Sequence, residues 1–271
     1  MSLTASTGPL GPRPAGRLNV ELDPPTGSVI LWDPVPQRIR GFVGGEAVVD
    51  SDRAVLLHEG GHLPVYYFPV GDVRMDLLEP TSKSTHCPHK GDASYWSIRV
   101  GDCVVENAAW SYREPLEPVA FIAGWIAFYW NSVDEWFAEE EQLYGHPRDP
   151  YHRIDVYPTT RHVRVLLDGE VLADSRRAKV LFETGLPPRY YLPAEDVRTE
   201  LLEPSAKKTR CAYKGSASYW SVGDEEDLVW TYADPQHDAE PVRNLLCFFQ
   251  ERVDLELDGV VGERPHTQWS K

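Results

Sequence analysis

Apolar and polar residues alternate with a period of two along much of this chain, in short runs that end at turn residues. Residues 163–167 (VRVLL) are followed by Asp168-Gly169 and then by residues 170–173 (EVLA). Successive side chains of a strand point to opposite faces, and Asp-Gly favours a tight hairpin turn. The pattern predicts a β-hairpin here, and residues 42–49 have a similar pattern around Gly44-Gly45.

Further runs of the same kind extend this prediction along the chain. Residues 179–183 (KVLFE) and 189–192 (RYYL) are typical of strands, and residues 193–197 of a turn or one helical turn. Residues 121–130 are apolar almost throughout, which fits a buried strand or a short helix. Residues 247–257 alternate up to Asp258-Gly259, which favours a strand that closes a domain. We therefore expect a mainly β protein of antiparallel sheets with few short helices.

The chain also repeats itself. A shift of 124 residues places residues 38–97 on 162–221 without a gap, and 31 of these 60 positions are identical. After a deletion of four residues, 110–112 (WSY) match 230–232 (WTY). A period this long is that of whole domains rather than of a short solenoid repeat. The sequence thus predicts a tandem duplication.

The repeat sets the expected domain boundaries. We expect β domains at residues 36–144 and 157–262, an N-terminal extension at 1–35 and a tail at 263–271. Residues 145–156 form the expected connector, in which prolines disfavour helix.

Composition and charge narrow the class of protein. The chain is 42% hydrophobic and 25% charged, and its nine Trp, thirteen Tyr and 23 Pro suit a β-rich globular protein. It has 27 Lys+Arg against 42 Asp+Glu, a net charge of −15. Nucleic acids and anionic membrane surfaces both attract clustered Lys and Arg, so the acidity argues against both as partners.

Several features indicate a soluble protein of a reducing compartment. The sequence contains no run of about 18 apolar residues, so we expect no transmembrane helix. Residues 1–25 lack the basic and then apolar segments of a signal peptide. The four cysteines include no C-x-x-C pair. We expect an acidic cytoplasmic protein.

A family resemblance begins at residues 211–215 (CAYKG) and 217–220 (ASYW). Together with residues 183–185 (ETG) and 189–193 (RYYLP), this block resembles the bacterial and fungal family called domain of unknown function 427, here in a two-copy form. The resemblance covers both repeats and is closer in the second, since His58 stands where the second copy has Phe182. It implies two tandem β-tent-like domains, each with two antiparallel sheets and an aromatic-lined cleft between them. The family has no assigned chemistry, although its label has suggested nucleotidyl transfer.

The Lys-Gly pairs at Lys90 and Lys214 are the first candidates for a ligand site. A Tyr-Trp pair follows each lysine at a short interval. A cation beside aromatic faces can bind a planar or anionic ligand, and a desolvated lysine can act as a nucleophile. The alternative is a lysine stem packed over a tryptophan with its ammonium group in water.

Arginines and tyrosines complete the predicted cleft. Arg74 and Arg198 lie five residues before Glu79 and Glu203, which fits an ion pair bracing a turn or an anion clamp. In the pairs Tyr66-Tyr67 and Tyr190-Tyr191, alternation sends one ring to the core and the other to the cleft, beside the aromatic residues Tyr95, Tyr219, Trp110 and Trp230.

The matched cysteines Cys87 and Cys211 are expected to be small buried side chains rather than reactive thiols. His86 and His89 flank Cys87, but Arg210 and Tyr213 replace them in the second copy. The first-copy block also lacks the second ligand pair that a structural zinc needs. We expect neither a bound metal nor a cofactor.

Paired carboxylates for nucleotidyl transfer are weakly indicated. Asp50 and Asp52 have the spacing, but the second copy has Arg176 in the place of Asp52. The matched acids Glu59 and Glu183 are assigned a strand-end hydrogen bond.

The sequence therefore favours a protein that binds a small planar or anionic molecule in an aromatic cleft with Lys and Arg anchors, and the second copy is expected to be the better site. A non-catalytic protein-interaction module and, less favoured, a nucleotidyl-transfer-type enzyme are the alternatives. No catalytic residue is assigned. The predicted ligand-binding residues are Lys214, Tyr219, Trp220, Tyr190, Tyr191, Arg198 and Cys211 in the second copy, and Lys90, Tyr95, Tyr66, Tyr67 and Arg74 in the first.

Overall fold

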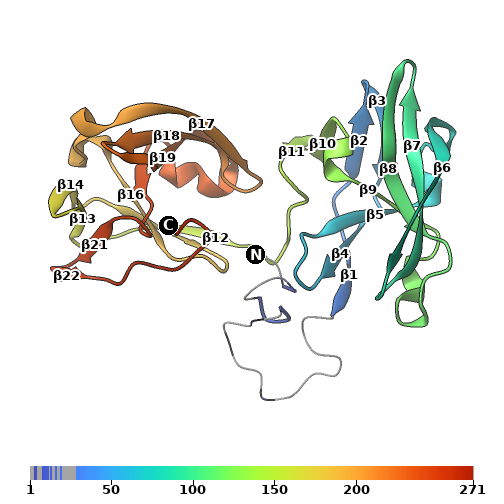
Figure 1. Ribbon diagram of the computed structural model, residues 1–271, viewed down its shortest axis with the longest axis horizontal. Coiled ribbons are helices and arrows are strands. Elements are labelled where there is room, and N and C mark those ends of the chain that lie inside the picture. The colour runs from blue at the N-terminus through green and yellow to red at the C-terminus, as the bar shows by residue number, and fades with distance from the viewer. Residues whose placement is uncertain are drawn as a thin grey trace. The chain divides into compact units, whose positions relative to one another are not determined.

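The computed structural model describes residues 3–4, 8–11, 13, 16, 19 and 29–270 (Figure 1). Most of the predicted N-terminal extension therefore lies outside the described residues, although its end contributes the first strand. The chain divides into two compact units, Met1–Asp149 and Pro150–Lys271. Among the described residues, no helix is long and apolar enough to cross a membrane.

The first unit contains two antiparallel sheets. The larger has seven strands in the order β1 (Ile30–Pro34), β4 (Val55–Glu59), β5 (Val65–Pro69), β9 (Trp125–Phe128), β8 (Cys103–Tyr112), β7 (Gly91–Val100) and β6 (Leu78–Cys87). The smaller has four, in the order β11 (Glu141–Leu143), β10 (Glu135–Ala138), β2 (Ile39–Val43) and β3 (Glu46–Ser51). Short 3-10 helices connect them: η2 (Val70–Asp72), η3 (Met75–Leu77), η4 (Glu117–Ile122) and η5 (Trp130–Ser132).

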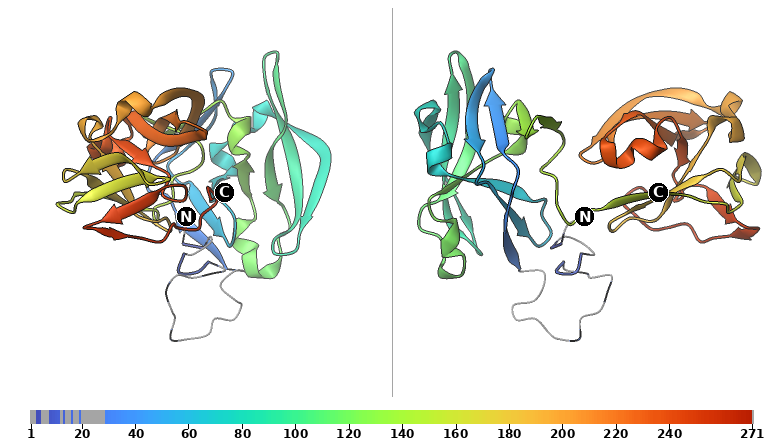
Figure 2. Two further views of the ribbon diagram at one scale, coloured as in Figure 1. Left: turned by 60° about the vertical axis from the view of Figure 1, so that its left-hand side comes forward. Right: turned by 180° about the vertical axis from the view of Figure 1, so that it is seen from behind.

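The second unit has the same two sheets. The larger runs β12 (Ile154–Pro158), β15 (Lys179–Glu183), β16 (Arg189–Leu192), β20 (Leu246–Phe248), β19 (Glu225–Pro235), β18 (Gly215–Val222) and β17 (Glu203–Cys211). The smaller runs β14 (Glu170–Ser175), β13 (Val163–Leu167), β21 (Asp254–Leu257) and β22 (Val260–Val261). Its 3-10 helices are η6 (Ala194–Asp196), η7 (Thr199–Leu201) and η8 (His237–Val242), and Figure 2 shows η8 lying against the curved larger sheet.

The duplicated sequence therefore folds twice into the same seven-strand order, which confirms the mainly β, two-domain prediction. The predicted hairpin is present as β13 and β14, and its turn residues Asp168 and Gly169 have φ values of 50° and 85°. These left-handed angles match the right-handed twist of the flanking strands, and Gly adopts them without cost.

Two predicted elements differ from the structure. Residues 121–130 are divided among the end of η4, the short strand β9 and the start of η5. The prediction of a single closing strand over 247–257 is wrong. The chain leaves the larger sheet after Phe248 and enters the smaller sheet at Asp254. The alternation of the sequence continues through this crossing although all of β20 is buried, so periodicity alone does not reveal the break.

Apolar side chains of the first domain form two clusters. One lies between the sheets and joins Ile39 and Val49 of the smaller sheet to Leu56, Phe68 and other residues of the larger. The other lies on the opposite face of the larger sheet, where strand alternation places Leu57 and the aromatic residues that neighbour it. This second cluster carries the candidate site.

Candidate functional site

The aromatic cluster of the first domain consists of residues that alternate with the inter-sheet core. Tyr67, Tyr95 and Tyr112 are nearly fully buried in it. The indole nitrogen of Trp110 donates a hydrogen bond to the hydroxyl of Tyr67 at 3.2 Å, and the ring of Tyr129 lies 4.6 Å from that of Trp110. Burial raises the pKa of Tyr67 well above its usual value, so its hydroxyl stays neutral and accepts this bond.

Lys90 enters this cluster from a turn between β6 and β7. Its amide donates to the carbonyl of Cys87 at 3.2 Å, and Gly91 follows with a φ of 96°. The ammonium group forms an ion pair with Glu59 at the end of β4, and only 8% and 16% of the two side chains are exposed. The alternative of a lysine with its ammonium group in water is therefore wrong. The fold removes the lysine from water and gives it a carboxylate partner.

The second domain repeats this pair. Lys214 pairs with Glu183, and both are largely buried. His152 Nε2 lies 3.1 Å from Glu183 Oε1, and the His152 ring stacks on Tyr213 with centroids 3.9 Å apart. Burial alone would raise the pKa of Glu183, but His152 and Lys214 together lower it to about 2. The carboxylate is ionised at neutral pH.

A cavity of about 690 Å³ adjoins the first-domain pair. It lies where the short strand β9 ends, because its walls include Val65 at the start of β5 and Tyr129 just after β9. It reaches from the outer aromatic cluster to Trp136 of the inter-sheet core. The polar groups on its walls include Glu59, Lys90, Cys87 and three histidines, His62, His86 and His89. Of the predicted first-copy residues, Lys90, Tyr66, Tyr67 and Tyr95 line it, and so does Cys87, the counterpart of Cys211.

Trp220 and Tyr190 lie on the opposite faces of their strands from Tyr219 and Tyr191. Trp220 is adjacent to Tyr219 on β18, so its side chain points to the opposite face, and its counterpart Trp96 is buried between the sheets. Tyr190 likewise alternates with Tyr191, whose hydroxyl accepts a 3.1 Å hydrogen bond from Trp230. The tyrosine pair is thus divided between the two faces of its strand.

Arg74 and Arg198 are exposed residues before the 3-10 helices η3 and η7. Arg74 donates two hydrogen bonds to Asp76, at 2.8 and 2.7 Å, while Glu79 pairs with Arg99. The predicted bracing pair between Arg74 and Glu79 is therefore wrong. Arg198 bonds to Glu200 and Glu170. Both arginines serve local ion pairs at the surface.

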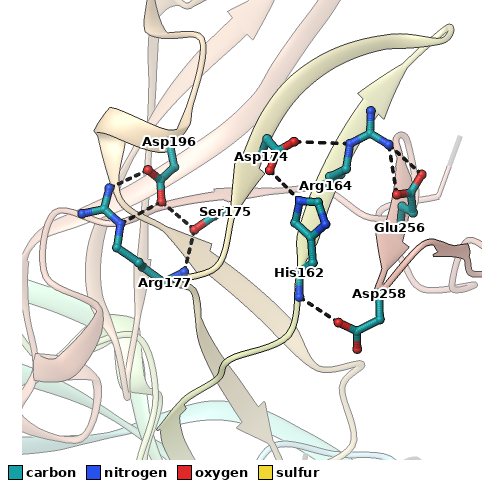
Figure 3. Close-up of polar contacts among 8 residues, drawn as sticks. All are labelled: His162, Arg164, Asp174, Ser175, Arg177, Asp196, Glu256 and Asp258. Carbon is teal, nitrogen blue, oxygen red and sulfur yellow. Dashed lines mark hydrogen bonds and ion pairs between the residues drawn. The ribbon is translucent and has the colours of Figure 1, made fainter.

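Asp50, one of the two carboxylates considered for nucleotidyl transfer, and its counterpart Asp174 are also held in ion pairs. Figure 3 shows Asp174 between His162, at 2.6 Å, and Arg164, at 3.5 Å. The neighbouring Ser175 donates to Asp196, which also accepts from Arg177. In the first domain, Arg38 bonds to Asp50 at 2.6 Å and lowers its pKa. These groups brace the smaller sheets.

The sequence pattern of the family described as Domain of unknown function (DUF427) matches residues 32–139 and 155–259, one segment in each domain. The chain belongs to the DUF427 family. A comparison with curated proteins finds no match.

The two DUF427 domains share further residues that sequence reasoning did not assign to the site. Glu59 and Glu183 were expected to make strand-end hydrogen bonds, yet each holds the buried lysine 31 residues after it. Lys83 lies 4.3 Å from the ring centre of Tyr95, and Lys207 lies 5.0 Å from that of Tyr219. All four occupy matching positions in the repeat, and this match is the feature of the sequence that could have identified them.

The DUF427 domains differ at the position where the first has its cavity. Val65 is replaced by Arg189, which is buried and donates two hydrogen bonds to Glu251, at 2.8 and 2.6 Å. Within the part of the chain that the structure describes, no group of three or more His, Cys, Asp and Glu residues is placed to hold a metal ion.

Proposed function

We propose that this chain binds a small planar molecule in the first-domain cavity, with Lys90 and Glu59 as its polar anchors. The observation that carries the proposal is a cavity of about 690 Å³ with aromatic walls and a largely buried lysine–carboxylate pair. Cavities of roughly 300–1,000 Å³ with mostly apolar walls and a few convergent polar groups are typical of small-molecule sites.

The wall chemistry favours a flat ligand. Aromatic side chains give a planar molecule a large contact area at low entropic cost. Tyr67, Trp110 and Tyr129 approach one another as a group of rings, and Tyr129 is 42% exposed at the rim. The ligand would lie against these rings.

The ion pair favours a ligand edge that both accepts and donates hydrogen bonds. An ammonium group has three donors, and a carboxylate has several acceptor sites, so each retains capacity beyond their mutual contact. Because Glu59 balances the charge of Lys90, a negative charge on the ligand adds less here than beside an unpaired lysine. A carboxylate or amide on a planar ring fits both anchors.

We place this site in the first copy, although the sequence favoured the second. The reason is local: the first copy has Val65 where the second has the bulkier, ion-paired Arg189. A protein-interaction module would not need a cavity of this kind.

The experiment is a thermal-shift titration with indole-3-acetate and naphthalene-2-carboxylate, each beside its neutral carboxamide. Binding to the folded state alone raises its stability by about 2.7 kcal/mol at a ligand concentration of 100 times Kd. We expect at least one compound to raise Tm in the wild type. The double variant Lys90→Met with Glu59→Gln should lose that response.

The matched control replaces an exposed ion pair of the same domain, through Arg99→Met with Glu79→Gln, and should keep the response. A second variant, Val65→Trp, fills the cavity and should abolish the shift without touching the ion pair. Equal shifts in all four proteins would contradict the proposal, because the compound would then bind outside this cavity. The absence of any shift in the wild type would also contradict it and would favour an interaction module.

A further inference from the structure

A chain segment covers the second domain where the first has its cavity. After β22 the chain turns back, and Trp269 lies with its ring centre 6.1 Å from that of Phe249. The guanidinium of Arg189 lies 5.6 Å from the centre of the Trp269 ring and 5.8 Å from that of Trp230. Trp269 thus lies on the aromatic cluster of its own domain.

The repeat shows that this position corresponds to the first-domain cavity. The shift of 124 residues places Arg189 on Val65, and the shift of 120 places Phe249 on Tyr129. The ring contacts match as well: Trp230 lies 4.6 Å from Phe249, and Trp110 lies 4.6 Å from Tyr129. Val65, Trp110 and Tyr129 all line the cavity.

A polar contact accompanies the ring. The hydroxyl of Thr267 donates to Glu251 Oε1 at 2.5 Å, and the amide of Trp269 donates to the Thr267 oxygen at 3.1 Å. The segment therefore presents one flat bicyclic ring and one hydrogen-bond donor to the pair formed by Arg189 and Glu251.

We propose that Trp269 occupies a second ligand site, in the second domain, and that a flat bicyclic aromatic molecule displaces it. The ligand class follows from what the chain places there: an uncharged ring against Phe249 and Arg189, with a donor toward Glu251. This inference goes beyond the first-domain site and does not depend on it. Because a ligand must displace Trp269 here, it binds more weakly than in the first-domain cavity and contributes little to the thermal shift at concentrations that fill that cavity.

The energetics allow the segment to leave. Glu251 keeps both hydrogen bonds from Arg189 when Thr267 departs, so no buried charge loses its partner. The described residues after Val261 contain no strand, and the turn at Thr267 is closed by Ser270. A segment held by one ring, a few hydrogen bonds and the exposed ion pair of Arg264 with Asp254 opens at low cost compared with paired strands.

The test observes Trp269 directly in the full chain. Protein labelled with 5-fluorotryptophan gives one fluorine resonance for each tryptophan, and Trp269→Phe identifies the one that belongs to Trp269. We expect added indole to move this resonance toward its solvent-exposed position in a saturable way. A resonance that stays in place at saturating indole would overturn the proposal.

Two variants keep the test decisive. Thr267→Ala removes the hydroxyl but retains the ring, and should tighten indole binding at this site about five- to tenfold because one hydrogen bond no longer holds the segment. Trp269→Ala should bind indole, and also a peptide of residues 264–271, with the peptide lost when its tryptophan is replaced by alanine. A folded Trp269→Ala protein that binds neither indole nor the peptide would contradict the inference.

Discussion

Lys90 and Lys214 show how burial converts a common surface residue into part of a site. Each lysine is held between a turn and the end of the strand that carries its glutamate. Bringing two charges out of water costs nearly as much as their attraction returns, so such pairs contribute little net stability. Their retention in both copies fits a role in binding or in fixing the turn.

Breaking the first-domain pair on one side should be more harmful than removing it altogether. Lys90→Met leaves Glu59 as an uncompensated, largely buried charge, and we expect a loss of roughly 3 kcal/mol in the free energy of unfolding. The double variant with Glu59→Gln should recover part of that loss. Urea unfolding measures both, and a double variant less stable than the single one would show that the charges themselves stabilise the fold.

Glu183 gives the second domain a defined acid sensitivity. Its pKa is about 2 in the folded state, below the usual 4.5. The ionised carboxylate therefore contributes its full stabilisation above about pH 4.5, and that contribution is lost as the pH falls toward 2. The shift corresponds to roughly 3 kcal/mol.

Glu183→Gln should accordingly flatten the fall in stability between pH 4.5 and 2. The measurement is the free energy of unfolding at several pH values in that range for wild type and variant. His152 and Lys214, which lower the pKa of Glu183, are the same in the wild type and in the variant, so the comparison isolates the carboxylate. Parallel curves would show that the carboxylate is not held as described.

At the scale of elements, the sequence predicts what depends on local alternation and turn chemistry. The β13–β14 hairpin is such a case, since Asp168-Gly169 specifies its turn. The four-residue deletion in the second copy is another case that local alternation explains. It falls in the β7–β8 hairpin and its counterpart β18–β19, where removing an even number of residues leaves every side chain on its original face. The prediction of one strand over 247–257 is wrong because the chain passes from one sheet to the other there. That crossing depends on how the sheets pack and not on local alternation.

The lysine-bearing turns allow a matched glycine test. Gly91 and Gly215 follow the lysines with φ values of 96° and 91°, so alanine is strained at either, by about 1–2 kcal/mol. A methyl group at Gly215 would also lie 2.9 Å from the carbonyl oxygen of Asp234, whereas at Gly91 the corresponding contact, with Glu114, is 3.4 Å. Gly215→Ala should therefore destabilise by about 1 kcal/mol more than Gly91→Ala. Chemical denaturation of the two variants decides this, and equal losses would contradict it.

At the scale of the whole molecule, the duplication was the strongest sequence signal, and it fixed one topology for both copies. The site was less predictable because its copies diverge in ways that only packing reveals. Arg189 and Trp269 come together from β16 and from the segment after β22, and neither has a matching residue of the same type in the first copy. The lysines were identified from the repeat, but their glutamate partners became evident only once the strand ends were placed.

Net charge adds a selectivity that belongs to the molecule as a whole. At −15 the protein repels anions over most of its surface, and at the site itself Glu59 balances the charge of Lys90. Raising the ionic strength should therefore strengthen the binding of a planar carboxylate by screening this repulsion, while its neutral carboxamide should be unaffected. Titrations at 20 and 500 mM salt compare the two, and a carboxylate that weakens with salt would mean that the cationic anchor dominates.

The central claim, that the first DUF427 domain holds the small-molecule site, is tested most directly by hydrogen–deuterium exchange with and without the compound that gives the largest thermal shift. The account predicts protection of amides at residues 86–90 and 128–130, on the walls of the first-domain cavity. It predicts no comparable protection at residues 211–214 of the second domain. No protection at residues 86–90, or equal protection at residues 211–214, would contradict it.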